Sequence, residues 1–567
     1  MTGRSRSRWS ASTRSFMGLF GALGAAMLLG GCRYRPAHFA DRPDVVKVGD
    51  DTPIPVPERN DFDEILQVSD AYLRRPLFDA LSPVEPPDAA DVSAMDEVPA
   101  SSWYLPPRQL SEILADREVS PAGPPVPPFL LEDAAPSLGS GGARIVIADS
   151  RGARYELARD TARRPELLTG AAAVGSRALR GLGYRTPDVF VVDVAPGDFG
   201  LDRTETVMPG AASPPLVGPS AEAERSAKAA RLAAYFAAGA PPREGRFRVS
   251  ATRWPVGIDV GIAQDFGTRG DDNNDRIAHH DRRTLRALSV FGAFLAFDGF
   301  GVRRTRDVYV GEPGKGFVRH YVVDLDRSLG AMSVVDPLPP YQPLAGPRGD
   351  GTFANLLLLG FAPAPRPKAT QRAFLGLGAI GPLANPKGTD TGIPYGPFSR
   401  LTRADGYWAA KRIQALLAMP STLEAIVDAG RYSEPGAREE LLSLLRLRGR
   451  QIVGHWFHQT TPIEVLSTED KRLVLRDEAI AGGYAPPGEI TYEISYLDGD
   501  GRVLVPTERL QASSDRFTLT MPAAIIDPKR NAVLHVRSLR RGRPAPMWCD
   551  VHLAFYVGGV RAYALTH

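Results

Sequence analysis

The chain has 567 residues, and this length excludes a single small module. Of these residues 43% are hydrophobic and 23% are charged, which excludes a wholly disordered chain. No repeat of fixed period is visible, which argues against a solenoid. The formal charge of +3 comes from 68 Lys and Arg against 65 Asp and Glu, and Arg4, Arg6, Arg8 and Arg14 supply that excess, so nucleic acid is not an expected partner.

The first 32 residues have the order of a secretion signal. Arginines precede an apolar stretch from Phe16 to Leu29, and the sequence Leu29-Gly30-Gly31-Cys32 follows. The stretch is short for a membrane span, and small residues before a cysteine suit a peptidase that cuts once the thiol carries a lipid. The pattern resembles a bacterial lipoprotein signal, so residues 1–31 are expected to be a signal peptide and Cys32 the lipidated N-terminus. An ordinary secretory signal or a short membrane anchor is the alternative.

The lipoprotein resemblance implies a location in the bacterial cell envelope. A multiply acylated Cys32 would hold the protein on a membrane, because each buried lipid methylene contributes about 0.8 kcal/mol. Arg33 follows the cysteine, and the absence of Asp there resembles lipoproteins that are sent on to an outer membrane. The membrane is therefore one expected partner. Cys549 is the only other cysteine, so an acylated Cys32 leaves no intramolecular disulfide.

Residues 32–140 are rich in Pro, Asp and Ala, which predicts a tether that is extended where proline dominates. Apolar residues recur at helical spacing between Phe62 and Leu73 and between Leu110 and Leu114. We expect two short helices that dock on the main domain.

A mixed α+β region begins at Arg144. Residues 144–148 and 153–158 flank a turn and predict a β-hairpin. A helix is predicted over 165–182, between a start at Pro165-Glu166 and glycines at its end, and a strand over 189–194.

The following elements are mainly helical. Helices are predicted over 221–238 and 284–297, and a second hairpin over 307–323 ends at Asp324. A Gly/Pro-rich insertion begins after Asp336. Three further helices are predicted over 407–417, 422–429 and 439–457.

Residues 462–567 change character again. Short strands at regular spacing predict a small β-sandwich-like domain, with an Asp-Gly turn at 498–501 between the first two. The predicted strands are 490–496, 502–505, 517–521, 532–537 and 551–557.

Several short segments carry a family resemblance through their shared order. They are residues 152–160, 165–171, 183–187, 267–275, 279–286 and 324–330. Together they resemble two-lobed kinases of the HipA and phosphatidylinositol-kinase type. The resemblance implies a kinase-like domain over 141–461, with an N-lobe over about 141–240 and a C-lobe over about 241–461. It also implies ATP and Mg²⁺ as ligands.

Phosphoryl transfer needs a cation on the phosphates, acids that hold Mg²⁺ and an Asp that positions the nucleophile. The resemblance puts Ala158 where the family has its phosphate-binding lysine and Arg304 where it has an asparagine metal ligand. Asp298 remains as the candidate catalytic residue, and Asp324 stands where a metal-binding Asp belongs. A surface turn acid is the alternative for Asp324.

Arginines are the remaining candidates for binding a nucleotide or another anion. Arg159 is adjacent to Ala158, but successive strand residues face opposite sides of a sheet. Arg304 is a second candidate. Arg282 and Arg283 would line a phosphate-facing cleft, although an exposed helix face or a salt-bridged interface between lobes explains them as well.

These replacements favour a pseudokinase-like domain that binds or scaffolds an unknown envelope protein or ligand at the membrane. Two alternatives stay open. One is an active but divergent metal-dependent phosphotransferase in which Asp324 holds the metal and Asp298 positions the acceptor. The other is a purely structural envelope protein.

Overall fold

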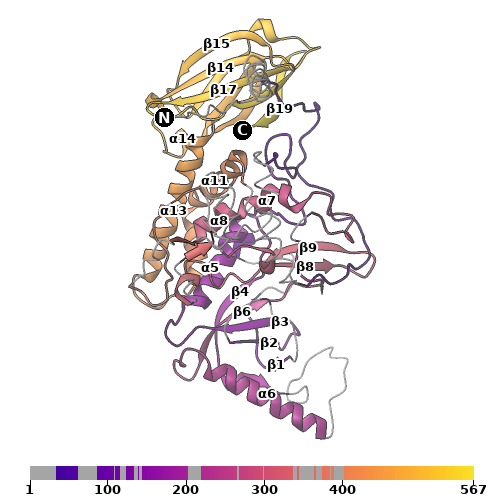
Figure 1. Ribbon diagram of the computed structural model, residues 1–567, viewed down its shortest axis with the longest axis vertical. Coiled ribbons are helices and arrows are strands. Elements are labelled where there is room, and N and C mark those ends of the chain that lie inside the picture. Colours follow the sequence, from indigo (N-terminus) through magenta and orange to yellow (C-terminus); the bar gives the residue numbers. More distant parts are fainter. Residues whose placement is uncertain are drawn as a thin grey trace, which may run out of the picture.

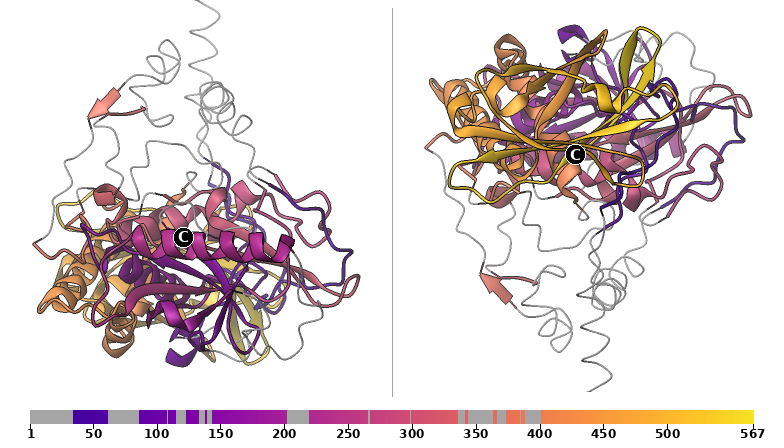
Figure 2. Two further views of the ribbon diagram at one scale, coloured as in Figure 1. Left: turned by 90° about the horizontal axis from the view of Figure 1, so that it is seen from below. Right: turned by 90° about the horizontal axis from the view of Figure 1, so that it is seen from above.

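The fold is α+β, with its parts arranged along one long axis. The computed structural model describes residues 34–61, 86–107, 109–114, 123–132, 138, 143–201, 219–264, 267–297, 299–335, 341–343, 363–365, 373–383, 385–387 and 401–567. Helix α6 (Pro219–Ala237) lies at one end of the axis, and a five-stranded sheet of the C-terminal region lies at the other (Figure 1). The two end-on views of Figure 2 show these two elements in front in turn.

A six-stranded sheet has the order β4-β6-β3-β2-β1-β5 and is antiparallel except where β1 pairs with β5. The predicted hairpin and the strand over 189–194 are confirmed. The sequence prediction missed β6, which lies between β3 and β4, so the sheet extends beyond the range 141–240. Its strands are β1 (Phe129–Leu131), β2 (Arg144–Ala148), β3 (Arg154–Arg159), β4 (Val189–Val194), β5 (Phe199–Gly200) and β6 (Phe247–Arg253).

Helices cover both faces of this sheet. On one face, Leu232 and Tyr235 of α6 share an apolar cluster with Ile145, Tyr155 and Leu157, which alternate along β2 and β3. On the other face, α5 (Leu167–Gly181) packs against β4 and β6 through small residues. The alternate residues of β2 and β3, among them Arg144, Glu156 and Ala158, therefore face the side of the sheet on which α5 lies.

The central part joins a second hairpin to a group of helices. β7 (Ile258–Asp259) and the predicted hairpin, β8 (Thr305–Val310) and β9 (Phe317–Val322), form a three-stranded sheet. The helix predicted over 284–297 is divided into α7 (Arg283–Arg286) and α8 (Leu288–Leu295). The three later helices are confirmed as α11 (Arg403–Leu417), α12 (Pro420–Asp428) and α13 (Ala437–Gln459). Short elements are α9 (Met332–Val335), β10 (Tyr341–Pro343) and β11 (Pro363–Pro365).

Two antiparallel sheets form the C-terminal region, and the Tyr492 ring of one stacks on Phe517 of the other at 4.5 Å between centroids. The predicted strands and the turn at 498–501 are confirmed, whereas β12, β13 and β19 were not predicted. The smaller sheet contains β12 (Ile463–Glu469), β13 (Arg472–Asp477) and β16 (Arg516–Thr520). The larger contains β14 (Ile490–Leu497), β15 (Val503–Gln511), β17 (Ala532–Arg540), β18 (Cys549–Tyr556) and β19 (Gly559–Thr566), and α14 (Glu478–Ala481) follows β13.

One apolar core connects the helices to these sheets. It runs from α5 and α8 through Trp408 of α11 and Phe457 of α13 to Ile463 and Leu534. All of these elements bury side chains in the same cluster, so the C-terminal region is packed directly on the helical group.

The described parts of the predicted tether are built into this body. Trp103 is buried and stacks on His320 at 4.0 Å between ring centroids, and Tyr104 is fully buried. Isolated β-bridges between backbone segments pair Ile54 with Gly316 and Asn60 with Gly261. The predicted helix at 110–114 is α4 (Leu110–Leu114), which packs on α5. Burial of large aromatic side chains is strongly favourable, and an extended spacer would leave these side chains exposed to water. The helix predicted within 62–73 lies outside the described residues.

Candidate functional site

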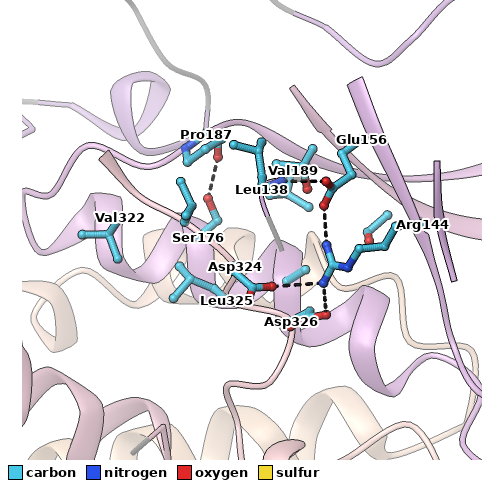
Figure 3. Close-up of a pocket in the computed structure, with 14 residues that line it drawn as sticks. Leu138, Arg144, Glu156, Ser176, Pro187, Val189, Val322, Asp324, Leu325 and Asp326 are labelled. Carbon is cyan, nitrogen blue, oxygen red and sulfur yellow. Dashed lines mark hydrogen bonds and ion pairs between the residues drawn. The ribbon is translucent and has the colours of Figure 1, made fainter. Parts of the chain in front are cut away.

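A small cleft lies between the six-stranded sheet, α5 and the chain that leaves β9 (Figure 3). Its lining includes Arg144 of β2, Glu156 of β3, Ser176 of α5 and the segment from Val322 to Asp326. The cavity has a volume of about 20 Å³, which is room for a water molecule. A nucleotide bound here would have to displace some of these side chains.

Strand register brings two charged residues to the cleft. Arg144 pairs with Ala158 and Val146 pairs with Glu156 across β2 and β3. Because side chains directly opposite each other share a face, Arg144 stands beside the methyl group of Ala158. A cation on β2 thus lies next to the position that the family resemblance assigns to a lysine on β3.

Arg144 binds three carboxylates. Its Nη2 lies 3.0 Å from Asp324 Oδ1 and 2.5 Å from Asp326 Oδ2, and its Nη1 donates to Glu156. The second Glu156 oxygen accepts the backbone N–H of Leu138 at 2.7 Å. These neighbouring negative charges raise the pKa of Arg144 and keep the guanidinium charged, although burial acts in the opposite direction.

Arg304 holds Asp324 from the other side. Its Nη1 lies 2.6 Å from Asp324 Oδ2 and also donates to the Asp324 carbonyl oxygen at 2.6 Å. Each oxygen of the Asp324 carboxylate therefore faces a guanidinium. A metal ion could use this carboxylate only by displacing one of the two arginines, because Mg²⁺ needs direct access to oxygen ligands.

Asp326 is the second aspartate that Arg144 contacts, and it is buried. Its Oδ1 is buried and has no hydrogen-bond partner among the described residues. Burial, followed by the negative charge of Asp324, raises the pKa of Asp326 to about 7 against the lowering effect of Arg144. Asp326 is therefore a proton-binding group near neutral pH.

The other predicted anion-binding arginines do not face this cleft. Arg159 points to the opposite side of the sheet and donates to the carbonyls of Tyr235 and Phe236 at 2.7 and 2.5 Å, at the end of α6. It caps a helix C-terminus, where a cation is favourable.

Arg282 and Arg283 are buried ion-pair partners. Arg282 Nη2 lies 2.8 Å from Asp275, and Arg283 contacts Asp96 at 2.7 Å and Asp405 at 3.1 Å. The cleft prediction for these two arginines is corrected accordingly, because both side chains already lie against carboxylates in the core. Both arginines are salt-bridged, but their partners lie in the range of the predicted C-lobe and in the N-terminal segment, and these contacts do not join the two predicted lobes.

Sequence reasoning placed two residues in this site and missed three. Asp324 and Arg304 were singled out and do contact each other. Arg144, Glu156 and Asp326 were missed, and the available signal was the register of the predicted hairpin, which sets Arg144 opposite Ala158. Asp298 and Cys32, the catalytic and lipidation candidates, lie outside the described residues.

Comparisons with known proteins add no family assignment. No protein-family model matches the chain, and no curated protein matches it. Within the described residues, no group of three or more histidine, cysteine or acidic side chains is placed to hold a metal ion. In the same part of the chain, every helix is too short or too polar to cross a bilayer.

Proposed function

We propose that this chain is a lipid-anchored protein of the bacterial cell envelope, with a pseudokinase-like domain that binds or scaffolds a partner. The anchor rests on the sequence Leu29-Gly30-Gly31-Cys32. The kinase-like lobes rest on the order of elements: a sheet with α5 beside it, a cleft, an Asp at the end of β9 and a helical group. The partner is an envelope protein or a small ligand.

The closed charge cluster carries the binding proposal. In a phosphotransferase the acid at the position of Asp324 must hold Mg²⁺ and a cation must hold the phosphates. Here the cation and the acid neutralise each other through Arg144 and Arg304. Opening such a buried cluster leaves charges without partners, which typically costs about 3–5 kcal/mol for a broken pair. This cost favours the closed cleft over an open cleft in which no ligand replaces the lost partners.

One observation favours the active phosphotransferase as a second candidate. Arg144 lies directly across from Ala158 and could supply the missing positive charge to a nucleotide phosphate. To do so its guanidinium would have to leave Asp324 and Asp326, and the freed Asp324 could then accept a metal ion. The two candidates therefore differ in whether the Arg144 to Asp324 contact ever opens.

A thermal-shift experiment tests nucleotide binding. We expect Mg²⁺-ATP to leave the melting temperature of a soluble form beginning at Arg33 unchanged, because the cleft is closed. A ligand at 100 times its Kd would stabilise the protein by about 2.7 kcal/mol, so binding would be visible. Arg144→Lys is the matched variant, since it keeps a charge but loses the forked contact with two carboxylates. A clear stabilisation of the wild type by Mg²⁺-ATP would contradict the closed cleft and favour the phosphotransferase.

A further inference from the structure

The chain joins the folded body directly after the proposed anchor. Arg33 alone separates Cys32 from Tyr34, the first described residue. The Tyr34 hydroxyl donates to Asp550 of β18, and its ring lies 4.7 Å from the ring of His535 on β17. His535 Nδ1 also contacts Asp550, at 2.5 Å, so Tyr34 sits on a connected polar group of the larger C-terminal sheet.

The residues after Tyr34 continue along the same sheet. The Phe39 ring meets the His552 ring edge-on at 5.0 Å, and Asp41 forms an ion pair with Arg561 and accepts from the Tyr556 hydroxyl. Phe39 also packs on the cluster of Ala554, Tyr563 and Ala564. These contacts follow β18 from its beginning to its end, and they fix the segment over at least eight residues.

The turn between β14 and β15 lies against Tyr34, the first described residue. Gly501 has a φ of +79° and lies so close to the Tyr34 carbonyl oxygen that a Cβ at this position would clash with it. Pro36 and His38 also lie beside this turn. The turn at 498–501 therefore packs beside the first described residues, Tyr34 to His38.

Chain geometry then limits the distance between anchor and body. Two successive Cα steps of about 3.8 Å place the Cα of Cys32 within about 8 Å of the Cα of Tyr34. We propose that the C-terminal sheet around Tyr34 and the turn at 498–501 is the membrane-facing surface of this protein, seated on lipid headgroups. The inference rests on the proposed lipidation of Cys32.

Tyr34, Arg35 and Trp548 at this surface suit a headgroup layer, whereas Asp498 and Asp500 of the turn carry negative charge. Tyr34 is 47% exposed and Arg35 is exposed beside it. Trp548 is half-buried. Its ring stacks on the His535 ring with 3.8 Å between the centroids, and the Arg537 guanidinium lies 4.3 Å from the centroid of the Trp548 ring. Tyrosine, tryptophan and arginine are favoured where an apolar layer meets water.

The orientation of the whole molecule follows from the long axis. The C-terminal sheet is at one end of this axis and α6 at the other, with the six-stranded sheet of the cleft beside α6 (Figure 1). An anchor at the first end therefore directs α6 and the cleft away from the bilayer. The cleft would meet partners in the aqueous compartment.

Fluorescence energy transfer on the full acylated chain tests this orientation. Donor dyes are attached to Asp500→Cys at the turn or to Ser226→Cys on exposed α6, and the protein is reconstituted into phosphatidylcholine and phosphatidylglycerol vesicles with a headgroup acceptor. Cys549 is fully buried, so labelling is selective. We expect transfer at position 500 to be several-fold higher than at position 226. Equal transfer, or higher transfer at position 226, would overturn the orientation.

A spacer variant provides the matched control. A 20-residue Gly/Ser insertion between Arg33 and Tyr34 adds a flexible reach of about 25 Å, so transfer at position 500 should fall while vesicle binding stays. Unchanged transfer would show that the short link does not set the orientation and would overturn the inference.

Mass spectrometry of the N-terminal peptide shows whether Cys32 is acylated, and it therefore tests the anchor proposal separately from the orientation. An unmodified Cys32, or equal vesicle binding by Cys32→Ser, overturns the anchor and the orientation together. An acylated chain with equal transfer at positions 500 and 226 overturns the orientation alone.

Discussion

At the scale of single residues, the cleft is defined by charge pairing. Arg144 and Arg304 bring two positive charges to Asp324, Asp326 and Glu156, and the Asp324 side chain is only 2% exposed. Buried charges are tolerated when partners surround them, and removal of one partner is costly. The pairing keeps the cleft closed, and burial, followed by the negative charge of Asp324, raises the pKa of Asp326.

The raised pKa of Asp326 predicts a pH-dependent stability. Its folded pKa of about 7 lies above its ordinary value of 3.8, so the folded protein binds more protons than the unfolded chain between about pH 4 and pH 7. The free energy of unfolding that this group contributes therefore decreases as the pH rises through that window. We expect Asp326→Asn to gain stability relative to the wild type over the same window, by at most about 1.4 kcal/mol per pH unit.

Urea unfolding at pH 4, 5, 6 and 7 measures this difference. Asp500→Asn, at an exposed turn, is the control and should show a constant difference from the wild type. A constant difference for Asp326→Asn as well would mean that Asp326 is ionised throughout the window.

At the residue level, the sequence predicted the place of a side chain at the end of an element, whereas the metal-binding role of Asp324 stays a prediction. Asp324 follows a β-branched strand, and its position at the mouth of the cleft could be expected from that pattern. The role of Arg144 could not, because it depends on which residue stands opposite it in the neighbouring strand. The pairing of Arg283 with Asp96 and Asp405 was equally hidden, since these three residues are far apart in the sequence.

At the scale of elements, periodic segments were predicted and irregular ones were not. Helices α5, α11 and α13 and the two hairpins have clear apolar periodicity, and they were found near their observed bounds. Strand β6, which joins β3 to β4, was missed although Phe247, Val249 and Ala251 alternate with polar residues along it, as in a strand with one buried face. The packing of residues 34–60 was also missed, because their composition is that of a tether and their contacts are with distant segments.

The packed N-terminal segment predicts that residues before Ala100 are required for stability. Asp96 illustrates the reason: its carboxylate lies 2.7 Å from Arg283 and 2.9 Å from His567, at a buried site. We expect Asp96→Asn to lower the free energy of unfolding by about 3 kcal/mol, because a buried guanidinium loses a charged partner. A chain that begins at Ala100 should be destabilised further.

Thermal melting and urea unfolding check this expectation. Asp51→Asn is the control, because Asp51 pairs with Lys47 on the surface and such pairs contribute about 0–1 kcal/mol. Equal stability of the chains that begin at Arg33 and at Ala100 would show that the N-terminal contacts contribute nothing.

At the scale of the whole molecule, the long axis separates the C-terminal sheet, which is the proposed membrane-facing end, from the part that holds the cleft. One apolar core runs from α5, beside the cleft, to the sheets of the C-terminal region. The closed cleft then lies where a partner can reach it, and its charges are committed to one another. The paired charges are the observation that supports the proposed binding or scaffolding role.

The measurement that tests this account most directly is phosphate release from ATP with Mg²⁺ or Mn²⁺. We expect no release by the wild type above that of Asp324→Ala, and Ala158→Lys should also be inactive, because the cation and the metal ligand of the cleft neutralise each other. Metal-dependent release by the wild type that Asp324→Ala abolishes would contradict the pseudokinase proposal and identify Asp324 as a catalytic metal ligand.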